Sequence, residues 1–250
     1  MRVFEADGCD GPEHVGAARA LLRLRTGCLT MDAATRTAEL RVPRVLTAEE
    51  LAHPYLGPAA AIAAHWEGWT AFHAGAVVAG EGVWGIVGER ERGKSSLLAH
   101  LAQSGHDVVA DDVLVLRPDG TAFAGPRSID LREEAAARLG VGRALGMAGA
   151  RQRWRVALPP VAAELPLRGW VFLDWGEDPD VLPMAPSACL VALLRTLTLR
   201  ISTAAPAAML AWAGLPARRF VRPRRWDAMA DGAALLMREL RSAGRVAGPA

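Results

Sequence analysis

Two residue types are almost missing from this sequence of 250 residues. Lysine occurs once, as Lys94, among 29 basic residues, and asparagine does not occur at all. The absence of asparagine excludes papain-like Cys-His-Asn catalysis and the metal-binding asparagine of the eukaryotic protein-kinase catalytic loop. Because arginine fills every other basic position, we expect the single lysine to have a specific task.

Cysteines and long apolar segments are also scarce. The three cysteines, Cys9, Cys28 and Cys189, are widely separated and form no CxxC pair, which argues against a disulfide framework and a structural zinc site. No apolar run approaches the roughly 18 residues that span a bilayer, and residues 1–15 lack the apolar segment of a signal peptide. We therefore expect a cytoplasmic protein without membrane contact.

The remaining composition is that of a folded globular protein. Hydrophobic residues make up 51% of the chain, charged residues 22%, and the formal net charge is only +2. Neither a nucleic-acid-coating protein nor a disordered chain has this balance. The eight tryptophans are dispersed, which favours core or interface positions over a stacking platform for bases. We expect no nucleic-acid partner.

Helix and strand patterns are mixed without strict alternation, which predicts an α/β fold with a mixed sheet. We expect a small N-terminal α+β extension, residues 1–69, packed on a core of residues 70–250. Residues 140–149, rich in glycine, are expected to be irregular. A capping box is predicted to join Thr47 to Glu50. The predicted helices are 17–24, 59–66, 94–103, 133–139, 187–198 and 227–241. The predicted strands are 27–31, 37–42, 70–78, 81–87, 107–110, 113–116 and 170–174.

The segment GERERGKS, residues 88–95, matches the phosphate-loop pattern GxxxxGK[ST] in full. A chance match in such a chain is expected about once in a thousand sequences. In this geometry backbone amides and a helix N-terminus surround the phosphates of ATP, the lysine reaches the β and γ oxygens, and the serine hydroxyl binds Mg²⁺. The predicted nucleotide-binding residues are Gly88, Glu89, Arg90, Glu91, Arg92, Gly93, Lys94, Ser95 and Ser96.

Glu91 departs from the many phosphate loops that have glycine at this position. A bare carboxylate would repel a triphosphate, so Glu91 must either point away from the nucleotide or pair with an arginine. A phosphate loop can serve an enzyme that transfers phosphate or a regulatory module that binds ATP without transferring it. Glu91 is the main support for the regulatory module.

Three further residues are candidates for the chemistry. Asp111 and Asp112 interrupt the apolar segment VVADDVLVL, where charged residues are costly unless they coordinate or pair. Adjacent residues on a strand project to opposite faces, so we expect the two carboxylates to have different tasks unless a bulge bends the chain. His73 lies in TAFHAGAVV among small residues that leave space around its ring.

These segments together resemble a known family. HAGAVV, then GERERGKSSLLAHLAQSGHDVVADDVLVL, is similar to the core of HPr serine kinase/phosphorylase, in the same order and with His73 fifteen residues before Gly88. The later segments GPRSIDLR and WVFLD are similar to short HPr-kinase-like proteins of lasso-peptide and other modified-peptide biosynthesis. The resemblance implies a fold related to the nucleotide-binding core of phosphoenolpyruvate carboxykinase.

The resemblance also implies an ATP- and Mg²⁺-dependent serine kinase that acts on a precursor peptide or small protein, and a possible homo-oligomer. It makes Asp111 the proton acceptor for the serine hydroxyl, with His73 beside it, and puts Asp112 with Ser95 on the metal side. A kinase for a small metabolite is a further alternative.

Arginines near this core are additional candidates. Arg132 could hold the transferred phosphoryl group or a peptide carboxylate, since arginine binds both as a fork, although it could also be a surface residue. The basic run ARRFVRPRR, residues 217–225, could dock an acidic peptide segment or be a solvated strand edge.

Overall fold

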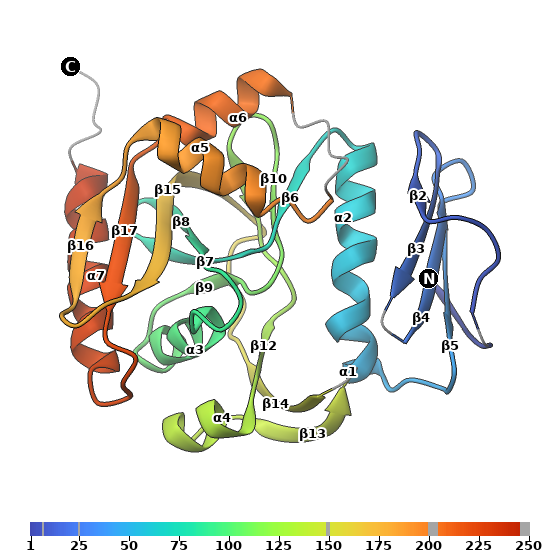
Figure 1. Cartoon of the computed structure of the whole chain (residues 1–250), viewed down its shortest axis with the longest axis horizontal. Helices are drawn as coiled ribbons and strands as arrows, with labels where there is room; N and C mark the ends of the chain where they lie inside the picture. Colours follow the sequence, from blue (N-terminus) through green and yellow to red (C-terminus); the bar gives the residue numbers. More distant parts are fainter. Residues whose placement is uncertain (7, 25, 149–150, 200–204, 246–250) are drawn as a thin grey trace.

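The structure is a computed structural model that describes residues 1–6, 8–24, 26–148, 151–199 and 205–245. A small N-terminal sheet, a helix beside it and a larger sheet with helices on both faces follow one another across the molecule (Figure 1). A three-stranded sheet lies near one end of that helix. The predicted α/β class with mixed sheets is confirmed, whereas the division at residue 69 stays a prediction.

The N-terminal sheet has the strand order β1–β5–β4–β3–β2. The predicted strands 27–31 and 37–42 are confirmed, and they pair antiparallel as a hairpin. The predicted helix 17–24 is wrong, because residues 19–24 pair along their whole length with the neighbouring strand of that hairpin. The five strands are β1 (Arg2–Glu5), β2 (His14–Val15), β3 (Arg19–Leu24), β4 (Gly27–Asp32) and β5 (Thr37–Val42).

A disulfide joins two of the three cysteines. Cys9, in the connection between β1 and β2, is bonded to Cys28 on β4, with 6.1 Å between their Cα atoms. The expectation that the cysteines form no disulfide is therefore wrong, since the fold of the sheet brings together residues that their spacing does not relate. Cys189 is free and buried.

A helical segment leads from this sheet to the larger one: α1 (Ala48–Glu50), the π-helical turn η1 (Leu51–Tyr55) and α2 (Leu56–Trp66). The predicted capping box is confirmed, since the Thr47 hydroxyl accepts from the Glu50 amide and the Glu50 carboxylate accepts from the Thr47 amide. Ile62 on α2 is fully buried in a cluster that includes Leu40 of the N-terminal sheet and Ala71 of the larger one. The helix thus joins the two sheets through a shared apolar core.

The larger sheet has the path β6–β10–β11–β15–β8–β7–β9, with β17 beside β15 and β16 beside β17. Parallel pairs join β8 to β15 and β15 to β17, and β7 pairs antiparallel with β8. The predicted strand 70–78 is interrupted at His73. The strands are β6 (Thr70–Phe72), β7 (Ala74–Ala79), β8 (Gly82–Val87), β9 (Val108–Ala110), β10 (Leu114–Leu116), β11 (Thr121–Phe123), β15 (Glu164–Trp175), β16 (Asp180–Pro183) and β17 (Ala217–Arg222).

Helices cover both faces of this sheet. On one face α3 (Lys94–Gln103) and α7 (Met229–Arg245) bury Leu97 and Leu236 in a cluster with Trp84. On the other face α5 (Pro186–Arg195) and α6 (Pro206–Ala213) bury Leu193 and Trp212 in a second cluster. Within the described ranges, no helix combines the length and hydrophobicity needed to span a bilayer.

The three-stranded sheet has the order β12–β14–β13, and α4 (Glu133–Leu139) follows its first strand. Its strands are β12 (Ser128–Leu131), β13 (Arg143–Ala148) and β14 (Arg151–Ala157). The prediction that residues 140–149 are irregular is wrong for 143–148, which pair with β14 through a register shift near Gly146; residues 149–150 lie outside the described ranges. A bulge of this kind lets a glycine-rich segment remain a strand.

Candidate active site

The predicted phosphate loop connects β8 to α3. The strand ends at Val87, the helix begins at Lys94, and Gly93 caps it with a φ of 71°, in the left-handed region that favours glycine. A Cβ at Gly93 would lie 2.9 Å from Nη2 of Arg222 and 3.2 Å from the Trp175 ring. Backbone conformation and close packing therefore both require glycine at this position.

The single lysine lies at the centre of the site. Lys94 is 7% exposed, and its Nζ is 3.1 Å from Oδ1 of Asp112 and 3.9 Å from Oδ1 of Asp111. Beside it, the Ser95 hydroxyl donates to Oδ1 of Asp111 at 3.2 Å. The first residue of α3, Lys94, thus lies near both aspartates, and the second, Ser95, bonds Asp111.

A left-handed residue explains how both carboxylates reach the same helix end. The chain leaves β9 at Ala110, and Asp112 has a φ of 65°. Asp112 is therefore not in extended backbone, and the opposite-face expectation for adjacent strand residues does not apply. Asp111 lies deeper: burial, and next the Asp112 carboxylate, raise the pKa of Asp111 to about 6. The two residues differ in depth rather than in face.

His73 lies at the break between β6 and β7. Its amide donates to the Thr196 carbonyl, and Nδ1–H donates to the Asp112 carbonyl at 3.0 Å. Partial burial, and next the Lys94 ammonium, lower the pKa of His73 below its usual range. The imidazole is therefore neutral at neutral pH, and it contacts the backbone of the outer aspartate.

Glu91 pairs with an arginine, which is one of the two outcomes that its charge required. Its Oε1 accepts from Nη2 of Arg132 at 2.8 Å, and this bond is the main cause that lowers the pKa of Glu91. Arg132, the residue before α4, is thereby held at the loop. Arg92 instead donates to Asp174 at 2.7 Å.

Arg222 is a functional candidate that the sequence did not single out. It is 2% exposed, its Nη2 donates to the carbonyl oxygens of Arg92 at 2.8 Å and Gly93 at 3.3 Å, and its guanidinium lies 4.5 Å from the ring centre of Trp175. Burial lowers the pKa of Arg222 to about 10, so it stays cationic at neutral pH. Neither interpretation of the basic run predicted a buried arginine bonded to the phosphate loop.

The bonds of Arg222 leave the loop amides available. Arg222 bonds two loop carbonyls, whereas no described residue accepts from the amides of Gly93, Lys94 or Ser95. Unpaired amides at a helix N-terminus form an anion-binding site.

A cleft of about 720 Å³ opens at this helix end. Most of the predicted site residues line it, whereas Asp111 and Arg92 are absent from its lining. The cleft residues that sequence reasoning missed include Tyr55, Arg151, Arg153, Trp175 and Arg222, which come from segments far apart in the sequence. The predicted residues that line it are His73, Gly88, Glu89, Arg90, Glu91, Gly93, Lys94, Ser95, Ser96, Asp112 and Arg132.

The described residues contain no group of three or more histidine, cysteine, aspartate or glutamate side chains that could hold a metal by themselves. The oxygen donors at the helix end are those of Ser95, Asp111 and Asp112. Mg²⁺ is commonly bound by one or two carboxylates together with substrate phosphates and waters. A site completed by a nucleotide fits this donor set better than a closed protein cage.

Comparison with known proteins adds little to this geometry. No family model matches the sequence, and no curated protein does. Among solved structures, the HPr(Ser) kinase/phosphatase from Coxiella burnetii is similar to 68% of this chain over 95% of its own, at 14% identity and a TM-score of 0.35. A likeness of that size decides neither the fold family nor the activity, which must be argued from the site.

Proposed function

We propose that the protein is a kinase that transfers the γ-phosphoryl group of ATP, with Mg²⁺, to a serine hydroxyl of a peptide or small protein. The observation that carries the proposal is the contact pattern at the start of α3. Lys94 contacts the carboxylate of Asp112, and Ser95 contacts that of Asp111. One helix end thus offers a cation for the phosphates, two oxygen donors for a metal ion and, in Asp112, a carboxylate that lines the cleft.

The residues present fit a Mg²⁺-bound nucleotide. The amides of Gly93, Lys94 and Ser95 and the Lys94 ammonium would hold the phosphates, and Ser95 with Asp111 would hold the metal side. Bound Mg²⁺ supplies positive charge to the phosphate oxygens. Arg222 keeps the loop carbonyls of Arg92 and Gly93 hydrogen-bonded, so they do not compete for the donors that the phosphates need.

The contacts support an exchange of the roles that the family resemblance implied. Ser95 bonds Asp111 rather than Asp112, and Asp111 does not line the cleft, which favours Asp111 for the metal side. Asp112 lines the cleft beside His73. We therefore assign to Asp112 the acceptance of the serine proton as the hydroxyl oxygen bonds to the γ-phosphorus and ADP leaves with the bridging oxygen.

The regulatory alternative loses its main support. Glu91 was the feature that favoured binding without transfer, and the ion pair between Glu91 and Arg132 offsets the repulsion that this carboxylate would exert on a triphosphate. A small-metabolite kinase is the second candidate function. The phosphate loop would hold ATP in the same way for either acceptor, and only the cleft residues that contact the acceptor would distinguish a metabolite from a peptide.

Transfer from [γ-³²P]ATP to a library of serine peptides, read by mass spectrometry, tests the function. We expect Mg²⁺-dependent addition of one phosphate, about 80 Da, to serine. Free serine serves as the metabolite control. Labelling of free serine with the peptides untouched would favour the metabolite kinase, and nucleotide binding without any transfer would favour the regulatory module.

A further inference from the structure

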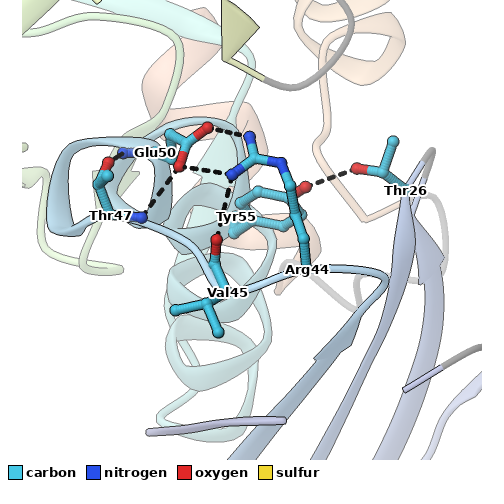
Figure 2. Close-up of polar contacts among 6 residues, drawn as sticks. All are labelled: Thr26, Arg44, Val45, Thr47, Glu50 and Tyr55. Atoms are coloured by element: carbon cyan, nitrogen blue, oxygen red, sulfur yellow. Dashed lines mark hydrogen bonds and ion pairs between the residues drawn. The ribbon is translucent and has the colours of Figure 1, made fainter. Parts of the chain in front are cut away.

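One wall of the cleft comes from the N-terminal part of the chain. Leu24, Thr26, Pro54, Tyr55 and Pro58 line it together with the phosphate loop. Tyr55, the only tyrosine of the sequence, donates to or accepts from the Thr26 hydroxyl at 2.5 Å, which ties η1 to the end of β3 (Figure 2). This wall is mostly apolar and is built from two elements that are bonded to each other.

Polar contacts around the buried Glu50 hold the chain just before the helical turn that carries Pro54 and Tyr55. Glu50 is 7% exposed and bonds both the guanidinium of Arg44 and the amide of Thr47 (Figure 2). The bond from Arg44 lowers the pKa of Glu50 to about 2. The π-helical turn that follows contains Pro54, and such turns occur frequently at functional sites.

The same wall adjoins the outer aspartate. A Cβ placed on Gly57 would lie 3.3 Å from Cγ2 of Val113, the residue next to Asp112. The first turn of α2 therefore borders the segment that carries the carboxylate to which we assign proton acceptance. A group held against Pro54 and Pro58 would lie at the Asp112 end of the cleft.

A row of arginines on β14 completes this end. Arg151, Arg153 and Arg155 are every second residue of the strand and therefore share one face. Their Cα atoms follow one another about 7 Å apart along the strand. Arg155 is fixed: its Nη1 donates to the Glu49 carbonyl of α1 at 2.9 Å, and it forms two bonds of 2.7 Å with Asp130. Arg153 therefore lies between the N-terminal wall and Arg151, which is close to the phosphate-loop residue Glu91.

Arg153 has charge but no partner in the described part of the chain. Its side chain makes no hydrogen bond or ion pair with a described residue, and its Nε is buried. Burial lowers the pKa of Arg153, and the charges that act on it next are those of Asp112 and Asp130. A half-buried guanidinium with no direct ion pair can bind the carboxylate of a ligand as a fork without first giving up a partner.

On the basis of the kinase function proposed above, we propose that the N-terminal wall and Arg153 form the acceptor-recognition site, which takes an extended peptide with an apolar side chain and a carboxylate close to the serine. The apolar side chain lies against Pro54 and Pro58, and the carboxylate pairs with the fork of Arg153. The serine between them lies at Asp112. The opposite end of the cleft, with Trp175 and Trp226, is left for the nucleoside.

A positional-scanning library of serine peptides tests the site with the full chain. We expect wild type to select aspartate or glutamate within three residues of the serine, together with a neighbouring leucine or phenylalanine. Arg153→Gln should raise the KM for the selected acidic peptide about ten- to a hundredfold. It should leave the KM for its Asp→Asn version and for Mg²⁺·ATP within about twofold. Arg168→Gln, an exposed arginine on β15 outside the cleft, is the matched control and should change neither constant.

The outcomes separate this site from the kinase function itself. Phosphorylation without acidic selection, or an Arg153→Gln variant that weakens Mg²⁺·ATP instead of the peptide, would overturn the site and leave the kinase function standing. No labelled peptide at all would overturn both. Pro58→Ser is the second variant, expected to reduce the apolar preference alone, and an unchanged melting temperature shows that each variant is folded.

Discussion

Two walls of the cleft, the phosphate-loop wall of residues 88–96 and the β14 wall of Arg151 and Arg153, differ in how their charges are paired. On the phosphate-loop wall Lys94 pairs with Asp112 and Glu91 with Arg132, and outside the cleft lining Arg92 of the same loop pairs with Asp174. On the β14 wall, Arg151 and Arg153 form no ion pair with any described residue. The phosphate-loop wall therefore contains direct ion pairs, whereas the arginines of the β14 wall have none within the described ranges, and Arg153 has only the more distant carboxylates of Asp112 and Asp130 acting on it.

This difference indicates what each wall can do with a ligand. A nucleotide that binds at the phosphate-loop wall must compete with the pair between Lys94 and Asp112. Lys94 would then exchange a carboxylate for phosphate oxygens. Binding there depends on Mg²⁺ to offset the charge brought by the phosphates. An anion that meets Arg153 displaces no partner and relieves repulsion among the arginines of β14 and Arg132. Specificity for an acceptor is therefore expected on the second wall, and chemistry on the first.

Removal of the lysine should produce the largest effect, because it breaks the paired wall at its centre. Lys94→Ala is expected to lower kcat/KM for ATP about a thousandfold, since the phosphates lose their buried cation. The protein should still fold, because Asp111 can take up a proton when its neighbouring cation is removed. Calorimetry with Mg²⁺·ATP and circular dichroism measure both results. Unchanged nucleotide affinity and transfer would show that residues 88–95 are not the phosphate site.

The two aspartates should separate binding from transfer. Asp112→Asn is expected to keep Mg²⁺·ATP affinity and lose about a hundred- to a thousandfold in transfer rate, because the amide cannot take the serine proton. Asp111→Asn should mainly raise the Mg²⁺ concentration needed for half-maximal rate. Transfer rates measured across a Mg²⁺ series distinguish the two. The reverse pattern would restore the role assignment that the family resemblance implied.

The phosphate-loop wall could be predicted from sequence because its signals are local. The loop, α3 and the strand before it lie within about twenty consecutive residues, and the positions of Lys94 and Ser95 follow from the motif alone. The relation of Asp111 to Asp112 did not, because it depends on the left-handed backbone at Asp112. A strand pattern predicts opposite faces and gives no signal for such a turn.

The N-terminal wall and the β14 wall could not be predicted, because segments far apart in the sequence form them. Tyr55 bonds Thr26, and Arg155 of β14 bonds Glu49 of α1, only after the N-terminal sheet, α1 and β14 are in place. β14 follows a glycine-rich stretch that has no strand pattern of its own, and β3 has an apolar pattern that is compatible with a helix. In both strands tertiary pairing outweighed the local signal. The one sequence signal beside the N-terminal wall was the capping box of Thr47 and Glu50, which lies just before η1, and it was confirmed.

The disulfide should stabilise the N-terminal sheet while leaving the phosphate-loop wall intact. Its two cysteines are 19 residues apart in the sequence. In the chain-entropy model, closing a loop of that size contributes about 3 kcal/mol to the free energy of unfolding. A reducing agent should therefore lower the melting temperature while Mg²⁺·ATP affinity is retained. Alkylation after denaturation is the control: the unreduced protein should take one label, on Cys189, and the reduced protein three. Three labels without reductant would show that the bond does not form.

The smallest effect is expected where the N-terminal wall is anchored. Glu50→Gln replaces the buried carboxylate that bonds Arg44 and Thr47, and it should cost about 1–3 kcal/mol of unfolding free energy at pH 7. The pKa of Glu50 is about 2 in the folded protein and about 4 in an unfolded chain. The stabilisation is therefore present above pH 4 and is lost as the pH falls towards 2, so wild type and variant should converge in acid.

Urea unfolding at pH 7 and at pH 2.5 measures this difference. Glu49→Gln is the matched control in the same short helix, because Glu49 forms an exposed pair with Arg143 and such pairs contribute less than about 1 kcal/mol. A Glu50→Gln variant that is as stable as Glu49→Gln at pH 7 would show that the buried Glu50 carboxylate does not anchor the wall. If the anchored wall recognises the acceptor, Glu50→Gln should also raise the KM for the selected peptide and leave that for Mg²⁺·ATP unchanged, because the change in shape lies on the acceptor side of the cleft alone.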